Sequence, residues 1–180
     1  MTMPKTPETL LDLISGGRPD HPAIIVPDGP VITYEALQSQ VAKLAAQLES
    51  AGISGGDRVA IVLPNGIEMI VSLLAVASVS TAAPLNPAYK ADEFDFYLRD
   101  TGAKTLITSD STGAEARGVV PDSVMQLSAQ LSPEGRVTLT PGTPAATKTL
   151  STTPSPDAVA LVLHTSGTTS RPKRVPLSHR

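Results

Sequence analysis

Apolar residues recur along the first half of the chain at a spacing that predicts a long amphipathic helix. Leu37, Val41, Leu44 and Leu48 are four, three and four residues apart, which places all of them on one helical face. Thr33 precedes this stretch and supplies a hydroxyl suited to an N-cap, while Gly52 follows it and is suited to end the helix. A helix is therefore expected between these two residues.

Nearly unbroken apolar runs, by contrast, predict strands that are buried on both faces of a sheet. The run at residues 58–63 is of this kind, and further short strands are expected at 81–85 and 104–108, with helical stretches at 67–79 and 91–100 between the strands. This alternation of strands and helices is typical of a mostly parallel sheet with flanking helices. The predicted fold class is therefore α/β, a fold in which ligands bind beyond the carboxyl ends of the strands.

The pattern is weaker on both sides of this alternation. Near the N-terminus, a short helix is expected to begin with Thr6 as its N-cap and Pro7 at its first position. Residues 109–157 are expected to form an irregular connector, with short strands at 124–127 and 136–140 and loop elsewhere.

Composition excludes several classes of site and partner. The 180 residues contain no Cys, which excludes disulfides and cysteine zinc sites. His21, His164 and His179 are too far apart in sequence to predict a metal site, so none is expected. A net charge of −3 and an aromatic content of 3% argue against a nucleic-acid partner. No apolar run reaches the roughly 20 residues that a membrane span needs, and the N-terminus has no apolar signal-peptide core, so a cytoplasmic protein is expected.

The segment with the most specific chemistry follows a further predicted strand at residues 158–163. Hydroxyl donors, a glycine that permits close approach of the backbone, and a lysine ammonium are the groups that bind a phosphate chain. The candidate phosphate-binding residues are Thr165, Ser166, Gly167, Thr168, Thr169, Ser170 and Lys173.

Charge supports the same interpretation, because residues 158–180 contain no acid and four cations, namely Arg171, Lys173, Arg174 and Arg180. The segment is not a Walker A loop, since the Gly-Lys-Ser/Thr ending of that loop is absent. The alternative interpretation is a Ser/Thr-rich surface turn followed by a solvated basic patch. The position directly after a buried strand favours phosphate binding.

Residues 165–173 resemble the AMP-binding signature of the adenylate-forming superfamily, which includes acyl-CoA synthetases, luciferases and the adenylation domains of peptide synthetases. Other stretches that resemble the same family are residues 33–37, 56–60, 63–65 and 84–87. Within the family, residues 82–86, 94–98, 163–164 and 170–173 look most like the oxalate–CoA ligases of plants and fungi.

The resemblance implies an ATP-dependent carboxylic acid–CoA ligase, with oxalate–CoA ligase as the nearest case. Such an enzyme activates a carboxylate as an acyl-adenylate, releases pyrophosphate and transfers the acyl group to coenzyme A. The implied cofactors and partners are ATP, Mg²⁺, coenzyme A and a small carboxylic acid. The resemblance assigns the hydroxyls of the loop and Lys173 to the phosphates of ATP, with Gly167 giving room for their approach.

Members of the family run to several hundred residues, so residues 1–180 are expected to be the N-terminal part of an AMP-binding domain. The catalytic residues and the magnesium-binding acid are expected beyond Arg180, and the 180 residues alone are expected to be inactive. The alternative is a truncated, non-catalytic remnant that at most binds nucleotide phosphates, and the alternative location is the peroxisome. Arg174 stands where the family usually has glycine, so its side chain is expected to strain or crowd the loop.

Overall fold

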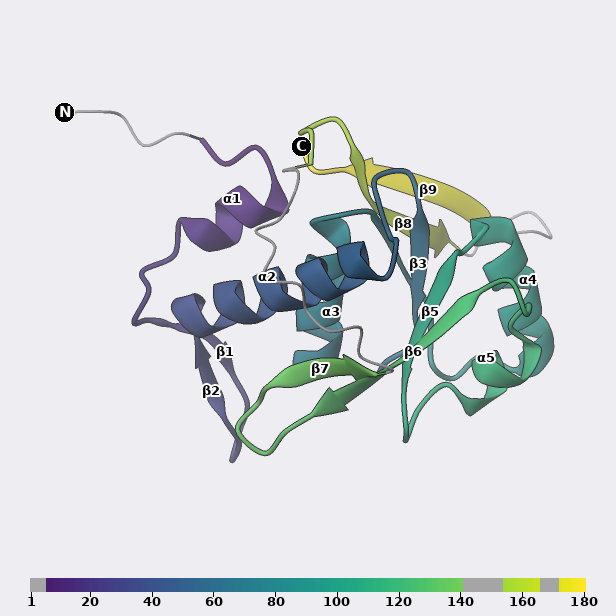
Figure 1. Ribbon diagram of the computed structural model, residues 1–180, viewed down its shortest axis with the longest axis horizontal. Coiled ribbons are helices and arrows are strands. Elements are labelled where there is room, and N and C mark those ends of the chain that lie inside the picture. Colours follow the sequence, from purple (N-terminus) through teal and green to yellow (C-terminus); the bar gives the residue numbers. More distant parts are fainter. Residues whose placement is uncertain (1–5, 141–153, 166–171) are drawn as a thin grey trace.

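A mostly parallel seven-stranded sheet with helices on both faces makes up the described part of the protein, residues 6–140, 154–165 and 172–180 of a computed structural model (Figure 1). The helices are α1 (Leu10–Ser15), α2 (Tyr34–Ser50), α3 (Ile67–Ala77), α4 (Ala91–Thr101) and α5 (Ala114–Val119). The strands are β1 (Pro22–Ile25), β2 (Val31–Thr33), β3 (Arg58–Ile61), β4 (Thr81–Pro84), β5 (Thr105–Ser109), β6 (Met125–Leu131), β7 (Val137–Thr140), β8 (Val159–Thr165) and β9 (Lys173–Ser178). None of the helices in these ranges is long and apolar enough to cross a membrane.

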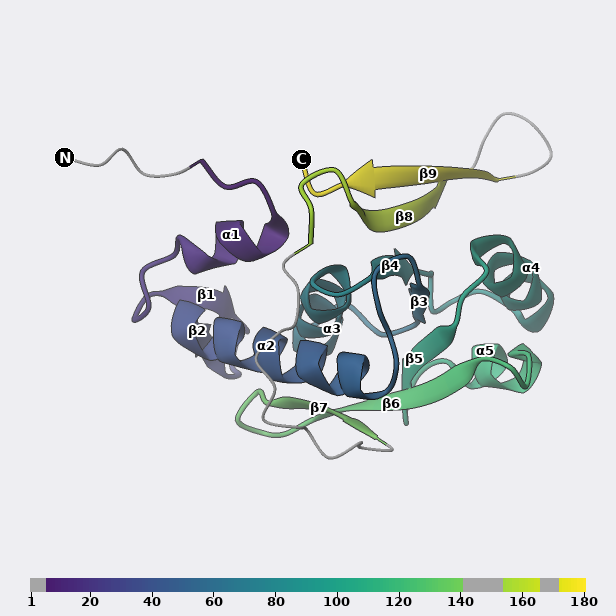
Figure 2. The same cartoon turned by 45° about the horizontal axis from the view of Figure 1, so that its top comes forward.

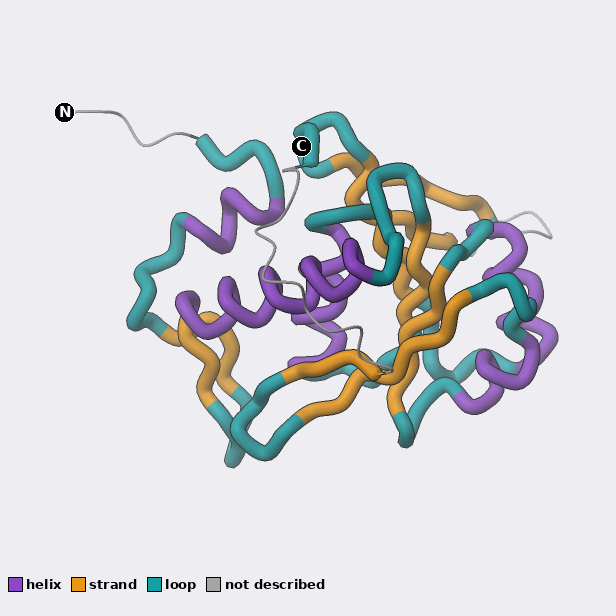
Figure 3. The backbone as a smooth tube through the Cα atoms, viewed as in Figure 1, coloured by secondary structure: helices purple, strands orange, loops and turns teal. Residues whose placement is uncertain are grey.

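The strands of the large sheet follow the order β7-β6-β5-β3-β4-β8-β9, while β1 and β2 pair separately as a small antiparallel sheet (Figure 3). Parallel pairing joins β6, β5, β3, β4 and β8, and the antiparallel strands β7 and β9 form the two edges of the described sheet. The predicted α/β fold with a mostly parallel sheet is thus confirmed. β3 pairs with both β4 and β5, so the chain changes direction across the sheet at β3.

Two apolar layers bury the two faces of the sheet. On one face, Val59 and Ile61 of β3 pack with residues of α2 and α3, and on the other face Ala60 and Val62 pack with residues of α4 and α5. Alternating residues of one strand point to opposite faces, which explains why the run from 59 to 63 is apolar throughout. The helices lie accordingly, with α2 and α3 on one side of the strands and α4 and α5 on the other (Figure 2).

Capping residues determine where the two N-terminal helices begin. Thr33 caps α2 as predicted, because its Oγ1 accepts a hydrogen bond from the backbone N–H of Ala36 at 3.2 Å. The predicted start of α1 at Thr6 is wrong, since this helix begins at Leu10 with Thr9 as its N-cap. The carboxylate of Asp12 accepts from the backbone N–H of Thr9 at 3.0 Å, and the Thr9 hydroxyl accepts from the N–H of Asp12 at 3.1 Å. This reciprocal pair satisfies two helix-end donors, which Thr6 and Pro7 would leave unsatisfied.

The predicted irregular connector at 109–157 is ordered over its first part, which contains α5, β6 and β7. The six-residue α5 is too short to show a helical period, and a tertiary contact supports it instead. Arg117 of α5 donates hydrogen bonds to Thr108 Oγ1 at 3.0 Å and to the carbonyl oxygen of Ser109 at 2.8 Å. Strands were expected at 124–127 and 136–140, and β6 extends beyond the first of these because it pairs with β7 up to Leu131. Residues 141–153 lie outside the described residues.

Candidate functional site

The carboxyl ends of the parallel strands β3, β4, β5 and β8 are the region where the fold predicts a ligand site. A cavity of about 380 Å³ opens where β3 and β4 end, and its lining residues are Leu63, Asn65, Met69, Pro84, Leu85, Asn86 and Pro87. The candidate phosphate-binding segment leaves the sheet at the carboxyl end of β8, the neighbour of β4. The fold therefore brings the predicted loop to the edge of the sheet that suits ligand binding.

An antiparallel hairpin carries the predicted loop between its two strands. Thr165 at the end of β8 lies directly opposite Lys173 at the start of β9, and the Thr165 hydroxyl donates to the carbonyl oxygen of Lys173 at 3.5 Å. Both residues are exposed. Residues 166–171 are outside the described part of the chain, so Ser166, Gly167, Thr168, Thr169 and Ser170 have no assigned positions. The structure thus brings together the two residues at the base of the predicted site.

The side chain of Arg174 does not strain the backbone, contrary to the expectation from the sequence. Asp28 is the single described residue other than glycine with a positive φ, so Arg174 adopts an ordinary strand conformation within β9. Its guanidinium NH1 donates to the backbone carbonyl of Asp100, at the end of α4. Arg174 therefore forms a tertiary contact at the base of the hairpin.

The cations of this segment do not gather at one point, because β9 separates them along its length. From Lys173 to Ser178 the strand runs about 17 Å, at about 3.4 Å per residue, and Arg180 lies beyond its far end. Arg180 forms an ion pair with Asp157 there. The local charge of this segment is thus divided between the two ends of the hairpin, and among the described cations Lys173 and Arg174 alone belong to the end that carries the loop.

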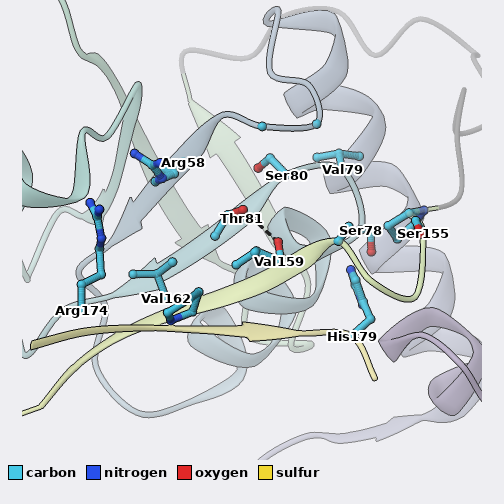
Figure 4. Close-up of a pocket in the computed structure, with 15 residues that line it drawn as sticks. Arg58, Ser78, Val79, Ser80, Thr81, Ser155, Val159, Val162, Arg174 and His179 are labelled. Atoms are coloured by element: carbon cyan, nitrogen blue, oxygen red, sulfur yellow. Dashed lines mark hydrogen bonds between the residues drawn. The ribbon is translucent and has the colours of Figure 1, made fainter.

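A larger cavity of about 550 Å³ lies at the opposite, amino-terminal edge of the sheet, between β3, β4 and the hairpin (Figure 4). Arg58 and Arg174 flank one side of this cavity, and Arg58 NH1 donates to the carbonyl oxygen of Thr101 at 2.7 Å. Its hydroxyl groups are also occupied by backbone acceptors: Ser78 Oγ bonds Leu74 O (2.6 Å), Ser80 Oγ bonds Val76 O (3.4 Å), and Thr81 Oγ1 bonds Val159 O (2.8 Å). Arg174 lines this cavity and is also the neighbour of Lys173 on β9, so the cavity reaches the base of the hairpin. The named arginine and hydroxyl groups have structural partners, whereas Nε2 of His179, which also lines the cavity, has none among the described residues.

His164 lies one residue before the loop and is buried against α4. Its side chain is 3% exposed, and Nε2 lies 2.9 Å from the Asp100 carboxylate. The imidazole also packs edge-on against the ring of Tyr97, with 4.8 Å between the ring centroids. Tyr97 in turn stacks on Tyr89, and burial together with a hydrogen bond to Tyr97 raises the pKa of Tyr89 to about 12. His164 is therefore part of the packing between the hairpin and α4.

Three further polar side chains have hydrogen-bond partners within the protein. Asn86 Oδ1 accepts from the N–H of Ala88 at 3.0 Å, which is a turn contact. Glu93 accepts from the N–H of Lys90 at 2.9 Å at the start of α4. His179 Nδ1 accepts from the N–H of Leu10 at 3.3 Å, and burial lowers the pKa of the His179 imidazole. Within the described ranges, no three histidine or acidic side chains are grouped closely enough to hold a metal ion.

Asp100 is the residue near the site that sequence reasoning missed. It lies in the last turn of α4, where the helix dipole disfavours a negative charge. An acid in that position is the one sequence signal for a tertiary partner, and the partner of its carboxylate is His164, while Arg174 donates to its backbone carbonyl.

Most of the chain is similar in sequence to other proteins. The sequence pattern of the family described as "AMP-binding enzyme" matches residues 14–180. The oxalate–CoA ligase of Arabidopsis thaliana is 38% identical over 175 residues, which are 94% of this chain and 34% of that protein. The probable CoA ligase CCL9 of Humulus lupulus is 42% identical over 166 residues, or 88% of this chain and 31% of that protein. The chain thus spans about a third of the length of these relatives.

Solved structures give the same result for the fold. Apo MatB from Rhodopseudomonas palustris matches with a TM-score of 0.75 and 30% identity, covering 96% of this chain and 35% of that structure. The N-terminal subdomain of NpsA from Klebsiella oxytoca matches with a TM-score of 0.72 and 28% identity, covering 94% of this chain and 41% of that structure.

Proposed function

The chain belongs to the AMP-binding enzyme family, and from this premise we propose that it forms the N-terminal part of the AMP-binding domain of an ATP-dependent carboxylic acid–CoA ligase. In the proposed reaction a carboxylate oxygen attacks the α-phosphorus of ATP, which gives an acyl-adenylate and pyrophosphate. The thiol of coenzyme A then attacks the acyl carbon, forms the thioester and releases AMP. The chain spans about a third of its curated relatives, so this reaction is proposed for a protein that contains these residues.

The proposed role of the loop is to bind the phosphates that become pyrophosphate. The hydroxyls of Thr165, Ser166, Thr168, Thr169 and Ser170 are proposed as donors, Gly167 gives room for close approach, and Lys173 supplies positive charge. The Thr165 hydroxyl has one proton, so on phosphate binding it exchanges its 3.5 Å bond to the carbonyl oxygen of Lys173 for one to phosphate. The position of Thr165 and Lys173 supports this assignment, because both are exposed and lie opposite each other at the carboxyl end of β8. Groups held in place before binding stabilise developing negative charge without further rearrangement, which favours departure of pyrophosphate.

ATP and coenzyme A are the proposed substrates that accompany the acid, and Mg²⁺ is proposed to bind with ATP. The described residues lack a cluster of three acidic or histidine side chains for the ion, so the contribution derived for this chain is hydrogen bonding and charge from the hairpin. Oxalate is the proposed acid, supported by the relative from Arabidopsis thaliana and by the Ser170–Lys173 stretch. The cytoplasm is the proposed location, with the peroxisome as the alternative, and a fluorescent fusion would distinguish the two.

A binding experiment on the 180-residue chain tests the role of the loop. Inorganic pyrophosphate is titrated into the wild type and Lys173→Ala, with Lys43→Ala on the exposed surface of α2 as a control for loss of one charge. A charge-assisted hydrogen bond contributes about 1.5–3 kcal/mol, so Lys173→Ala is expected to weaken binding at least about tenfold. Equal weakening by Lys43→Ala would show that the effect is long-range charge alone.

A chimera tests the proposed reaction. Residues 1–180 replace the matching third of the Arabidopsis thaliana relative, and the two half-reactions are measured separately with oxalate. Lys173→Ala is expected to slow adenylate formation roughly ten- to a hundredfold, while thioester formation from preformed adenylate changes far less, since pyrophosphate has already left. Similar slowing of both steps would contradict a role confined to phosphate binding. Pyrophosphate binding by the chain together with an inactive, folded chimera would favour the non-catalytic remnant.

A further inference from the structure

Both strands of the hairpin are held to the same residue of α4. On β8, His164 Nε2 donates to the Asp100 carboxylate at 2.9 Å, and on β9, Arg174 NH1 donates to the Asp100 backbone carbonyl. His164 and Arg174 are also direct partners in the antiparallel register of the hairpin. We refer to Asp100, His164 and Arg174 as the hairpin clamp.

The contacts of the clamp are unusual for a surface feature. The His164 side chain is 3% exposed, and its Nδ1 has no hydrogen-bond partner among the described residues. The bond from Nε2 to Asp100 is thus the polar contact that compensates for burial of this imidazole. Asp100 itself lies in the last turn of α4, where an acid opposes the helix dipole unless positive partners compensate for it. Both observations favour a specific role for the contact.

The place of the clamp relative to the loop suggests what that role is. The register pair next to His164 and Arg174 is Thr165 and Lys173, the two residues that flank the predicted loop. One step along a strand is about 3.4 Å, so the clamp fixes the backbone immediately beneath the two proposed phosphate ligands. Holding these residues before phosphate binds reduces the conformational entropy that is lost on binding.

We propose that Asp100 is a positioning residue for phosphate binding, which acts through His164 and Arg174 by holding both strands at the base of the loop. This inference rests on the proposed function, because it assumes that the loop binds phosphate. It adds a residue on a different element, α4, that does not itself touch the ligand. It also predicts that Arg174 supports the site, so that Arg174→Gly weakens phosphate binding.

The direction in which one substitution changes the pyrophosphate affinity distinguishes a positioning role of Asp100 from an effect of its charge. Asp100→Ala removes a negative charge near an anion site, so electrostatics alone predicts tighter binding of pyrophosphate to the 180-residue chain. Asp100→Ala breaks the bond to His164 and keeps the backbone carbonyl that Arg174 contacts. Loss of this half of the clamp predicts weaker binding instead, by about three- to tenfold, the range expected when a few side chains must be ordered on binding. Asp100→Asn keeps an oxygen that accepts the His164 Nε2–H and is expected to restore most of the affinity.

A matched pair on β9 tests the second strand. Arg174→Gln and Arg180→Gln each remove one positive charge from the same hairpin, at opposite ends. The clamp predicts that Arg174→Gln weakens pyrophosphate binding by about three- to tenfold, while Arg180→Gln changes it less than about twofold. Equal effects would attribute the loss to net charge and overturn the role of Arg174.

Hydrogen exchange without ligand tests the clamp independently of the proposed function. Amides of residues 163–165 on β8 are expected to exchange faster in Asp100→Ala, and those of residues 173–175 on β9 in Arg174→Gln. Exchange at the wild-type rate is expected in Asp100→Asn and Arg180→Gln. Unchanged exchange in the first two variants would show that there is no clamp. Faster exchange with unchanged pyrophosphate affinity would show that Asp100 holds the hairpin without positioning the site.

Failure of the proposed function and failure of the positioning role of Asp100 give different experimental results. If the wild-type chain binds no pyrophosphate, the proposed function and with it the positioning role are wrong, while the exchange rates still decide whether Asp100 holds both strands. If Asp100→Ala does not fold, Arg174→Gln and its Arg180→Gln control decide the outcome by the same two measurements.

Discussion

The same substitution, threonine to valine, is expected to have opposite effects at two buried positions of the sheet. The Thr81 hydroxyl of β4 donates to the carbonyl oxygen of Val159 at 2.8 Å, whereas the Thr105 hydroxyl of β5 has no hydrogen-bond partner in the described part of the chain. Both threonines are buried, at 7% and 0% exposure. Valine has nearly the shape of threonine, so the change removes the hydroxyl with little change in packing.

The size of the change in the free energy of unfolding depends on whether removing the hydroxyl leaves another polar group without a hydrogen-bond partner. Thr81→Val removes the hydrogen bond and leaves the carbonyl of Val159 without its donor, a loss of about 1–3 kcal/mol. Val159 is 38% exposed, so water partly replaces the donor and the expected loss is about 1–2 kcal/mol. Thr105→Val instead removes the cost of burying an unpaired hydroxyl, so its free energy of unfolding is expected to be unchanged or up to about 1 kcal/mol higher.

Urea unfolding of the chain measures both effects. The midpoint should fall for Thr81→Val with the slope unchanged, and Thr81→Ser should retain most of the stability because it keeps the hydroxyl. The contact also joins the hairpin to the rest of the sheet, since β4 and β8 share a single register pair, Ala82 with Leu161. Equal losses for Thr81→Val and Thr105→Val would refute the reasoning, because the hydrogen bond would then make no difference.

Two further comparisons follow from the structure. Gly113 has φ +90°, and a Cβ there would lie 2.6 Å from Cγ2 of Thr108, so Gly113→Ala should lower the melting temperature. Nothing lies within 4 Å of a Cβ at Gly118 in α5, so Gly118→Ala should raise the melting temperature. Burial lowers the pKa of His179 below 6.5, so the unfolded chain takes up this proton first as the pH falls, and the free energy of unfolding should decrease from pH 7 to pH 5. Urea unfolding of His179→Gln should show a weaker pH dependence than that of the wild-type chain.

The periodicity of apolar residues was sufficient to predict the central part of the fold. After Arg58, strand β3 is apolar throughout because Val59 and Ala60 face different apolar layers, and α2 shows a clear helical period because one of its faces is buried. These elements are stabilised by burial, and the buried positions can be recognised in the sequence from the spacing of apolar residues. Cap positions were less predictable, since Thr6 and Thr9 have the same side chain and only the Asp12 contact selects Thr9.

Elements at the edges of the sheet were harder to predict because their apolar residues follow no clear pattern. All six residues of β9 are exposed, and Pro176 interrupts its pattern, so no strand was predicted there. Proline is tolerated in an edge strand because half of the backbone N–H groups of that strand have no strand partner, and pairing with β8 then makes the segment a strand. The short helix α5 was missed for a related reason, because its order depends on hydrogen bonds from Arg117 rather than on its own period.

The sequence by itself determined the chemistry of the candidate loop, because hydroxyls, glycine and lysine have their donors and charge wherever the chain places them. Only the tertiary structure decided how these groups are supported. The antiparallel register sets Thr165 against Lys173 and separates Lys173 from Arg180, and the packing of β8 on α4 brings His164 and Arg174 to Asp100. His164 and Asp100 are 64 residues apart, and such a contact depends on how two elements pack, which no local pattern encodes.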